Sequence, residues 1–522
     1  MAKKKQLTRE EIAAIEVGHT EISPIAAKVF SIIFIVMIVA FPAVHIIRHP
    51  DTVGSIFPAI GSAFKTSSPK EFNDTLKKGF QDYEDSINET TPVREAFLEP
   101  LQQFLLTAFE TGNEKVIVGK DGYLFYPEDV DYLLEPGFMR HARQWKRKQS
   151  GVQPDPAEAI TKFSKDLKER GIRLIVLPVP VKACFYGDKL HATKAYLENK
   201  DYGYFLDVLK RNEVDVLDLN EDFHNLQLSG TQPFLKTDTH WTPEAMDLAA
   251  DRCAKMLGCD NALPAGDEAT VTNIGDTAAL LKLKENPYPP ETVTIKQFDM
   301  IPDTSSDVLI LGDSFVNIYS MEAMNWGIRG GFSEHLAARL DRQIDVIARN
   351  DGGDYASRSI LAKELARGRD RLAGKKTVIW VFSARKLPAG DWKDFDLMVG
   401  KAPESTFLTI EEPRTVTATV LAVTSVPRPH SAPYKDHVMS LHLGDIDGGD
   451  AEALVYIASM RDNVWTKAAK VRIGDTVYID LKPWEDFEDE YGSWNRSEFD
   501  DDELLLQDPC WGEITEMNLI KP

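Results

Sequence analysis

The feature that most limits how this chain can fold is a series of five short, apolar, β-branched runs separated by segments of helical periodicity. Runs of this kind are typical of parallel strands that crossover helices bury on both faces. The sequence therefore predicts an α/β domain in three layers around a parallel sheet. The predicted strands are 172–178, 214–219, 307–311, 345–348 and 377–382, and the predicted helices are 157–170, 204–211, 243–257 and 332–340.

A second domain is indicated by a change in the sequence pattern near residue 400. Helical periodicity stops there, and β-prone runs follow at 416–426, 437–446, 451–459 and 475–481, with a further strand expected near Ile514. This number of short strands favours a small all-β barrel of the OB type over a compact sandwich. We expect the α/β domain over residues 107–400 and the β domain over 401–522. Two β-prone runs around a Lys-Asp-Gly turn at 116–126 predict a hairpin near the start of the α/β domain.

An unbroken apolar run from Val29 to Val44 marks the N-terminal part, and it reaches Ile47 if His45 is tolerated. Basic residues precede it, so the positive-inside bias predicts a cytoplasmic segment 1–28 and a single inner-membrane signal anchor 29–47. A stalk would follow over 48–106, and the rest would lie in the periplasm. The alternatives are a cleaved signal peptide and a buried core helix, but no small-x-small cleavage site follows the run cleanly and it has no polar face.

Charge and motif content exclude several other functions. The formal net charge of -22 argues against nucleic acid as a partner, because that binding depends on neutralising phosphates with Lys and Arg. The four cysteines form no metal framework, although a local disulfide between Cys253 and Cys259 stays open. The segment 374–377 lacks the glycine spacing of a phosphate loop and precedes a strand. We therefore predict neither a cofactor nor a metal.

Two short motifs are the candidates for chemistry, namely 236–243 (KTDTHWTP) and 311–315 (LGDSF). Ser314 directly follows a predicted strand, at the sheet edge where ligands bind and where backbone N–H groups can face a developing oxyanion. Asp238 and His240 are one residue apart, so both side chains leave an extended chain on the same side. A serine nucleophile needs a base, and the base needs an orienting carboxylate. The motifs therefore predict a triad of Ser314, His240 and Asp238.

Each motif alone also has a plainer interpretation. A Gly-Asp-Ser after a strand is usually a turn, and Thr242 with Pro243 reads as the N-cap and first residue of the next helix. Further oxyanion or substrate contacts are predicted at Asn350 and Gly352, in a glycine turn after the fourth strand, and at Arg385 after the last one. These residues are explained as well by a simple turn and by an ion pair.

The stretch from about Pro92 to Leu387 resembles the alginate O-acetyltransferase family of the AlgJ and AlgX type. The resemblance implies an SGNH-hydrolase-like fold in which Ser314 carries the acyl group, His240 is the base and Asp238 is its partner. It also implies a polysaccharide acceptor and a membrane-bound O-acyltransferase that relays acetyl groups across the membrane. The matching pieces are 116–126 (VIVGKDGYLFY), 179–182 (VPVK), 238–243 (DTHWTP), 312–315 (GDSF) and 378–385 (VIWVFSAR).

Together these features predict an O-acetyltransferase that acts on an extracytoplasmic polysaccharide in two steps through an acetyl-serine. Two alternatives stay open. A carbohydrate acetylesterase would use the same triad but let water attack, and the motifs do not encode water exclusion or acceptor positioning. A non-catalytic, glycan-binding subunit of an exopolysaccharide export complex would use the β domain for binding.

Overall fold

The computed structural model describes residues 99–518, apart from 136, 191, 193, 284, 351, 401–406, 428, 430–433, 493, 500, 502–503 and 505–506, together with residues 28, 29 and 31. Apart from residues 29 and 31, the predicted signal anchor 29–47 therefore lies outside the described residues, as does most of the predicted stalk 48–106. Within the described part, no helix combines the length and the apolar character that crossing a membrane requires. The description below concerns the compact unit Leu105–Lys521.

All five predicted strands of the α/β domain are present, and they form one parallel sheet in the order β4-β3-β9-β7-β8. The three central strands are buried over almost their whole length, as expected for strands that helices cover on both faces. The edge strand β4 is shorter than predicted because helix α11 (Asn220–Leu228) begins soon after it. The strands are β3 (Arg173–Val179), β4 (Asp215–Val216), β7 (Val308–Gly312), β8 (Asp345–Ala348) and β9 (Thr377–Ser383).

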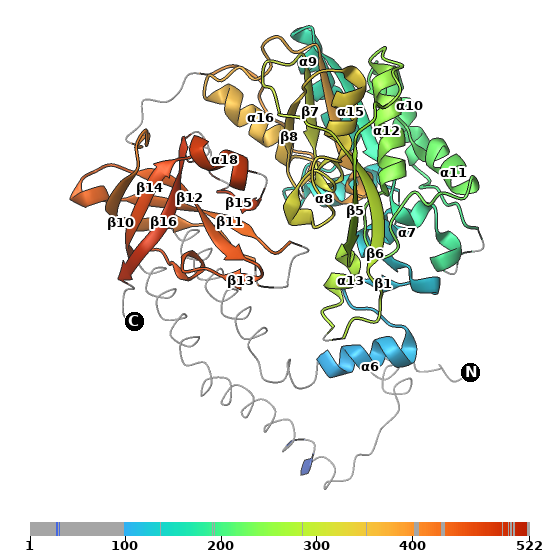
Figure 1. The fold of residues 1–522 in the computed structure, drawn as a ribbon, viewed down its shortest axis with the longest axis horizontal. Coiled ribbons are helices and arrows are strands. Elements are labelled where there is room, and N and C mark those ends of the chain that lie inside the picture. Colours follow the sequence, from blue (N-terminus) through green and yellow to red (C-terminus); the bar gives the residue numbers. More distant parts are fainter. Residues whose placement is uncertain are drawn as a thin grey trace, which may run out of the picture. The chain divides into compact units, whose positions relative to one another are not determined.

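The four predicted helices are also present, with ends within two residues of the expected ones. In α9 the Asp155 carboxylate caps the first turn and Pro156 occupies the first helical position, while Phe163 packs edge-on against Trp380 of β9. Helix α16 (Ala356–Ala366) packs beside α9, because the Arg358 guanidinium lies over the ring of Phe163, and α12 lies next to α15 (Figure 1). The predicted helices are α9 (Pro156–Glu169), α10 (Tyr202–Arg211), α12 (Pro243–Met256) and α15 (Phe332–Leu340).

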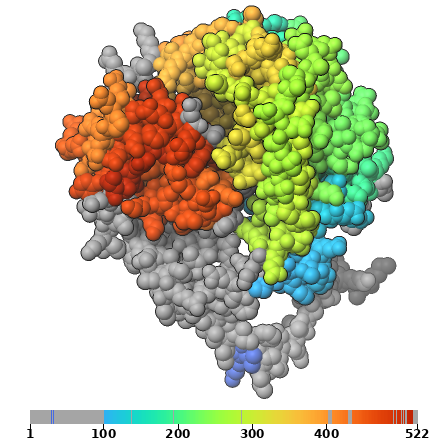
Figure 2. All heavy atoms as spheres, viewed as in Figure 1, coloured from blue at the N-terminus to red at the C-terminus, as the bar shows by residue number. Residues whose placement is uncertain are grey.

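Two hairpins accompany the sheet. The predicted one pairs β1 (Ile117–Val118) with β2 (Leu124–Phe125). The other, which the sequence did not reveal, pairs β5 (Asp267–Asn273) with β6 (Glu291–Gln297) and lies along the chain between the candidate motifs 236–243 and 311–315. Its inner apolar residues pack on the main core, and its outer face, rich in threonine, lies at the molecular surface (Figure 2).

The C-terminal strands form the predicted small barrel. Five strands follow one another in the order β12-β16-β14-β10-β11, and a further pairing of β11 with β12 closes the ring. The barrel has its own apolar core, distinct from the core around the parallel sheet. The strands are β10 (Arg414–Val423), β11 (His437–Gly444), β12 (Ala453–Arg461), β14 (Thr476–Pro483) and β16 (Pro509–Asn518). All four cysteines of the chain are free thiols, so Cys253 and Cys259 are not bridged.

Candidate active site

Ser314 stands at the carboxyl edge of the parallel sheet, where β7 ends and the short helix α14 (Ser314–Asn317) begins. The buried carboxylate of Asp313 fixes this turn, because it accepts hydrogen bonds from the backbone N–H groups of Phe315 and Ser383, each at 2.9 Å. Burial raises the pKa of Asp313. A Cβ at Gly353 would lie 2.6 Å from the Asp313 carboxylate, so only glycine fits beside this turn.

The imidazole of His240 connects Ser314 to Asp238. His240 Nδ1 lies 2.7 Å from Asp238 Oδ1, and His240 Nε2 lies 2.8 Å from Ser314 Oγ. A carboxylate only accepts hydrogen bonds, so Nδ1 carries the proton and Nε2 is free to accept the hydroxyl proton of Ser314. The side chains of His240 and Asp238 are 4% and 3% exposed, which keeps water away from this pair.

The second oxygen of Asp238 is also occupied. Asp238 Oδ2 accepts hydrogen bonds from the indole N–H of Trp326 at 2.9 Å and from the backbone N–H of Asp276 at 3.0 Å. Burial alone would raise the pKa of Asp238, but the charge and hydrogen bond of His240, with these two donors, hold it below its usual range. Asp238 is therefore an ionised partner for an imidazolium that forms at His240.

Asp276 brings a second carboxylate to His240. Its two oxygens accept hydrogen bonds from the backbone N–H and hydroxyl of Thr239, at 2.8 and 2.6 Å, and Asp276 Oδ2 lies 3.7 Å from His240 Nδ1. Burial and the nearby charge of Asp238 raise the pKa of Asp276. Burial opposes a charge on His240, but Asp238 and Asp276 outweigh it and raise the His240 pKa. Gly275 permits this approach, since a Cβ there would lie 2.1 Å from the carbonyl oxygen of Thr237.

Two further side chains fix the loop that carries Asp238. The ammonium group of Lys182, which is completely buried, donates hydrogen bonds to the carbonyl oxygens of Leu235, Lys236 and Asp238, at 3.2, 3.0 and 2.7 Å. Burial lowers the pKa of Lys182. On the hairpin, Glu291 accepts hydrogen bonds from the backbone N–H groups of Lys236 and Thr237, at 2.9 and 2.7 Å. Lys182 therefore binds the carbonyl groups of the loop backbone, and Glu291 binds its N–H groups.

Asp238, His240 and Asp276 place potential ligand atoms within 4.8 Å of one another, which raises the question of a metal. The hydrogen bonds argue for a different use. Both oxygens of Asp238 accept N–H protons, and the oxygens of Asp276 are bonded to Thr239. The Nδ1 atom of His240 is already paired with Asp238, so the donor set matches a proton-transfer chain.

Arg385 and Asn350, two of the three further predicted oxyanion or substrate contacts, bond to other groups. Arg385 pairs with the buried Asp129 at 3.0 Å, as in the ion-pair alternative, although its guanidinium also lies over the ring of Phe315. Asn350 accepts a hydrogen bond from Asn317, which lies one helical turn beyond Ser314 in α14. Gly352 has a left-handed φ of +58° at the turn. Among the described residues, no hydrogen bond links Arg385 or Asn350 to Ser314.

Sequence reasoning missed Asp276, Trp326 and Glu291, because each meets the Asp238 loop from a segment that is distant in sequence. Lys182 offered a weak signal, since it lies in one of the family-like pieces, but nothing local indicated its contacts. The predicted N-cap is confirmed: Thr242 Oγ1 accepts a hydrogen bond from Ala245 N at 3.3 Å, and Pro243 begins α12. This cap fixes the point at which the chain passes from His240 into α12.

Comparison with known proteins gives a family match over this region and several related proteins. A family model described as an SGNH hydrolase-like domain, acetyltransferase AlgX, matches residues 116–384, slightly more than half of the chain. A probable alginate O-acetylase AlgJ of Pseudomonas fluorescens is 25% identical over 300 residues, covering 54% of this chain and 71% of that protein. A protein of the same description from Pseudomonas aeruginosa is 27% identical over 172 residues, covering 33% and 40%.

Two solved structures match part of the chain. The O-acetyltransferase domain of Pseudomonas putida AlgJ has a TM-score of 0.39 and 23% identity, and the match covers 54% of this chain and 95% of that domain. Pseudomonas aeruginosa AlgX has a TM-score of 0.36 and 15% identity, with 67% and 84% covered.

Proposed function

The chain belongs to the family of SGNH hydrolase-like acetyltransferases typified by AlgX, and we propose that it acetylates a polysaccharide through an acetyl ester on Ser314. The observation that carries this proposal is the position of His240 between Ser314 Oγ and Asp238, with 2.8 and 2.7 Å to the two partners. This is the arrangement that converts a serine hydroxyl into a nucleophile.

In the first half-reaction, Ser314 Oγ attacks the carbonyl carbon of the acetyl donor while His240 Nε2 takes the hydroxyl proton. The carbonyl oxygen becomes an oxyanion beside the backbone N–H of Ser314, which is the first donor proposed for it. The tetrahedral intermediate then collapses: the bond to the leaving group breaks, and His240 Nε2–H returns the proton to that group. The product is an acetyl ester on Ser314 and a deacetylated donor.

In the second half-reaction, a sugar hydroxyl occupies the place that the leaving group vacated. His240 Nε2 removes its proton, the sugar oxygen attacks the acetyl carbon, and the Ser314 Oγ bond breaks as Oγ regains a proton from His240. The charge on the imidazolium in both halves is balanced by Asp238, whose depressed pKa keeps it ionised. No proton needs to pass to Asp238 in this scheme.

We also propose that the segment 29–47 anchors the chain in the inner membrane and that the catalytic domain lies in the periplasm. The apolar run and its basic flank support this orientation. A polysaccharide that is modified outside the cytoplasm needs an acetyl group delivered across the membrane, which a membrane-bound O-acyltransferase would supply. The relatives' names suggest alginate as one acceptor to test.

The test of the function is direct detection of the intermediate and of its transfer. The purified chain is incubated with an acetyl ester donor, and the peptide that contains Ser314 is examined by mass spectrometry for an acetyl group. A polysaccharide is then added, and acetylated sugar is measured together with free acetate. An acetyl-serine that decays only to free acetate, with every acceptor tried, would instead identify an esterase.

A further inference from the structure

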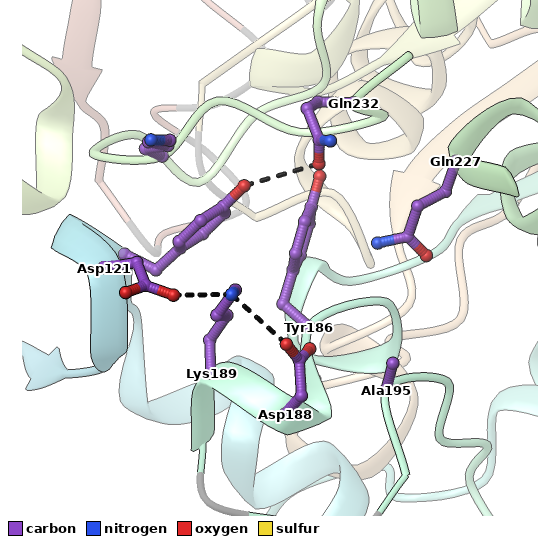
Figure 3. A pocket seen from close by; sticks show the side chains of 9 residues that line it. Asp121, Tyr186, Asp188, Lys189, Ala195, Gln227 and Gln232 are labelled. Carbon is purple, nitrogen blue, oxygen red and sulfur yellow. Dashed lines mark hydrogen bonds and ion pairs between the residues drawn. The ribbon is translucent and has the colours of Figure 1, made fainter. Parts of the chain in front are cut away.

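A polar pocket of about 550 Å³ lies beside the segment that leads into the Asp238 loop (Figure 3). Its volume is in the range of pockets that hold a small ligand or one unit of a larger one. Lys189 and Lys236 line it, together with the amide side chains of Gln227 and Gln232. None of these four side chains takes part in the proton-transfer chain from Ser314 to Asp238.

The walls of the pocket come from segments near the carboxyl edge of the parallel sheet. Lys189 lies in the 3₁₀ helix Gly187–Leu190, which follows the carboxyl end of β3, and Lys236 lies in the Asp238 loop itself. Lys236 precedes His240 by four residues, so their α-carbons are at most about 14 Å apart. Ligands of open α/β sheets bind along this edge. The pocket therefore shares a loop with His240, the residue that contacts Ser314.

Several hydrogen-bonding groups of the pocket are available to a ligand. Gln232 Oε1 accepts a hydrogen bond from Tyr123 Oη at 3.3 Å, and Gln227 Nε2 donates one to the carbonyl oxygen of Phe185 at 2.9 Å. The other end of each amide bonds to no residue that the structure describes. Lys236 has no carboxylate within ion-pair distance in the described part of the chain, and its ammonium lies 5.4 Å from the centre of the Tyr123 ring.

The charges of the pocket are balanced. Lys189 pairs with Asp121 at 2.6 Å and with Asp188 at 3.3 Å, so two carboxylates face two ammonium groups when Lys236 is included. A balanced set of this kind does not select a dense polyanion. It does offer both donors and acceptors over a short distance.

The aromatic residues of the pocket form a wall and leave no open face for stacking. The rings of Tyr123 and Tyr186 pack against each other with 4.6 Å between centroids, and the two residues are only 5% and 2% exposed. An apolar or aromatic ligand would find little open surface here. A ligand rich in hydroxyl groups, each of which donates one hydrogen bond and accepts others, fits the available groups.

We propose that this pocket binds a sugar unit of the acceptor polysaccharide that neighbours the unit acetylated at Ser314. The inference rests on the proposed function, because it assumes that a polysaccharide is the acceptor. Binding energy from a unit that does not react can hold the reacting hydroxyl in place, which lowers the barrier of the transfer step. Lys236, Gln227 and Gln232 would supply specificity without touching the acetyl group.

Equilibrium binding tests the pocket independently of the chemistry. The full chain carrying Ser314→Ala is titrated calorimetrically with two probes, alginate hexasaccharide and cellohexaose. With whichever probe binds, adding Lys236→Gln should weaken the affinity by about tenfold, the usual effect of losing a hydrogen bond to a charged group. Asp188→Asn, which is nearly isosteric, should weaken it by a smaller factor. The matched control is Lys210→Gln, an exposed lysine of α10 outside the pocket, and it should bind like the parent.

Catalysis provides the second measurement. In the chain with Ser314 intact, Lys236→Gln should lower the ratio of kcat/KM for hexasaccharide to kcat/KM for disaccharide. Equal binding by the parent and both pocket variants would overturn the site while leaving the proposed function in place. Binding that both variants weaken, in a protein that transfers acetyl to no glycan, would uphold the site and reject the transferase. If the parent binds neither probe, the pocket assignment is wrong.

Discussion

Asp276 Oδ2 lies 3.7 Å from His240 Nδ1, so the imidazole faces a second carboxylate besides Asp238 at 2.7 Å. Asp276 also donates its backbone N–H to Asp238 Oδ2 and accepts two hydrogen bonds from Thr239. Asp276 therefore contacts Asp238 and Thr239, and its carboxylate adds negative charge beside the imidazole of His240. We regard Asp276 as a positioning residue, because it acts on the reaction through His240.

Asp276→Asn should move the acid limb of the pH profile to lower pH. His240 must be neutral to accept a proton, so activity appears as the pH rises through the His240 pKa. Burial lowers that pKa, but Asp238 and Asp276 raise it overall, and the limb of the native enzyme should lie above about pH 6.5. Removing the Asp276 carboxylate lowers the His240 pKa, because one of the two negative charges that raise it is lost. The measurement is kcat/KM between pH 5 and 9.

The control for this experiment is Asp267→Asn, an exposed carboxylate at the start of β5, which should leave the limb in place. The positive charge of Arg385 lowers the His240 pKa, and this charge is present in both variants, so it does not affect the comparison. A fall in activity with an unchanged limb would mean that Asp276 only supports the loop.

Ser314→Ala should abolish acetyl transfer, because no acetyl ester can form. His240→Ala should cost on the order of 10⁴-fold in rate, and the double variant should lose little more, since members of one triad act as a unit. Asp238→Asn should have a milder or comparable effect through the tautomer of His240. Ser305→Ala, in an exposed loop, is the matched control. Substantial transfer by Ser314→Ala would remove the nucleophile assignment and favour a binding subunit.

Lys182→Met should reduce both stability and activity. Methionine fills the space but leaves the carbonyl oxygens of Leu235, Lys236 and Asp238 without their buried donor. An unsatisfied buried polar group costs about 1–3 kcal/mol, so the free energy of unfolding should fall by at least this amount in chemical denaturation. Lys165→Met, on the exposed side of α9, is the control and should be nearly neutral. Native stability in Lys182→Met would show that water replaces the ammonium.

Removal of residues 401–522 should leave a folded α/β domain, because the barrel has a separate apolar core. The cut must follow Trp392 and Leu397, since both belong to the core of the α/β domain. Truncation after residue 400 should therefore give soluble protein with a cooperative thermal transition, and truncation after residue 385 should not. Insolubility of the longer fragment would place the domain boundary elsewhere.

The predicted anchor 29–47 is tested by fusing a reporter that is active only in the cytoplasm after Pro522. The basic residues before the apolar run predict export of everything after it, so the fusion should be silent. A fusion placed before residue 28 should be active and serves as the control. A bright C-terminal fusion would reverse the orientation.

The sheet and the barrel were predictable because their strands carry the signals that burial leaves in a sequence. A strand buried on both faces reads as a continuous apolar run, as in Val308–Gly312. The sequence did not reveal strands β5 and β6, because their outer positions are threonines and charged residues and, of their inner residues, only Ile295 is fully buried. The pattern of a weakly amphipathic hairpin is hard to separate from that of a loop.

The candidate triad was readable because Asp238 and His240 are adjacent and Ser314 follows a strand. The rest of the site was not, because its contacts join residues that are far apart in sequence. Asp276 lies 38 positions from Asp238, Glu291 lies 54 positions from Thr237, and Trp326 lies 88 positions from Asp238. Such pairings depend on the folded backbone, and no local spacing encodes them.

The hairpin of β5 and β6 has a consequence for engineering. Its residue Glu291 accepts hydrogen bonds from the backbone of the loop that holds Asp238, and Asp276 begins the short helix α13 (Asp276–Leu280) in the connection between the two strands. The smallest unit that can be transplanted to another α/β scaffold is therefore larger than three side chains. A graft of Ser314, His240 and Asp238 without the β5–β6 segment would carry the reactive atoms but not the residues that align them. A natural variant with a shortened hairpin should likewise lose catalytic activity before it loses the fold.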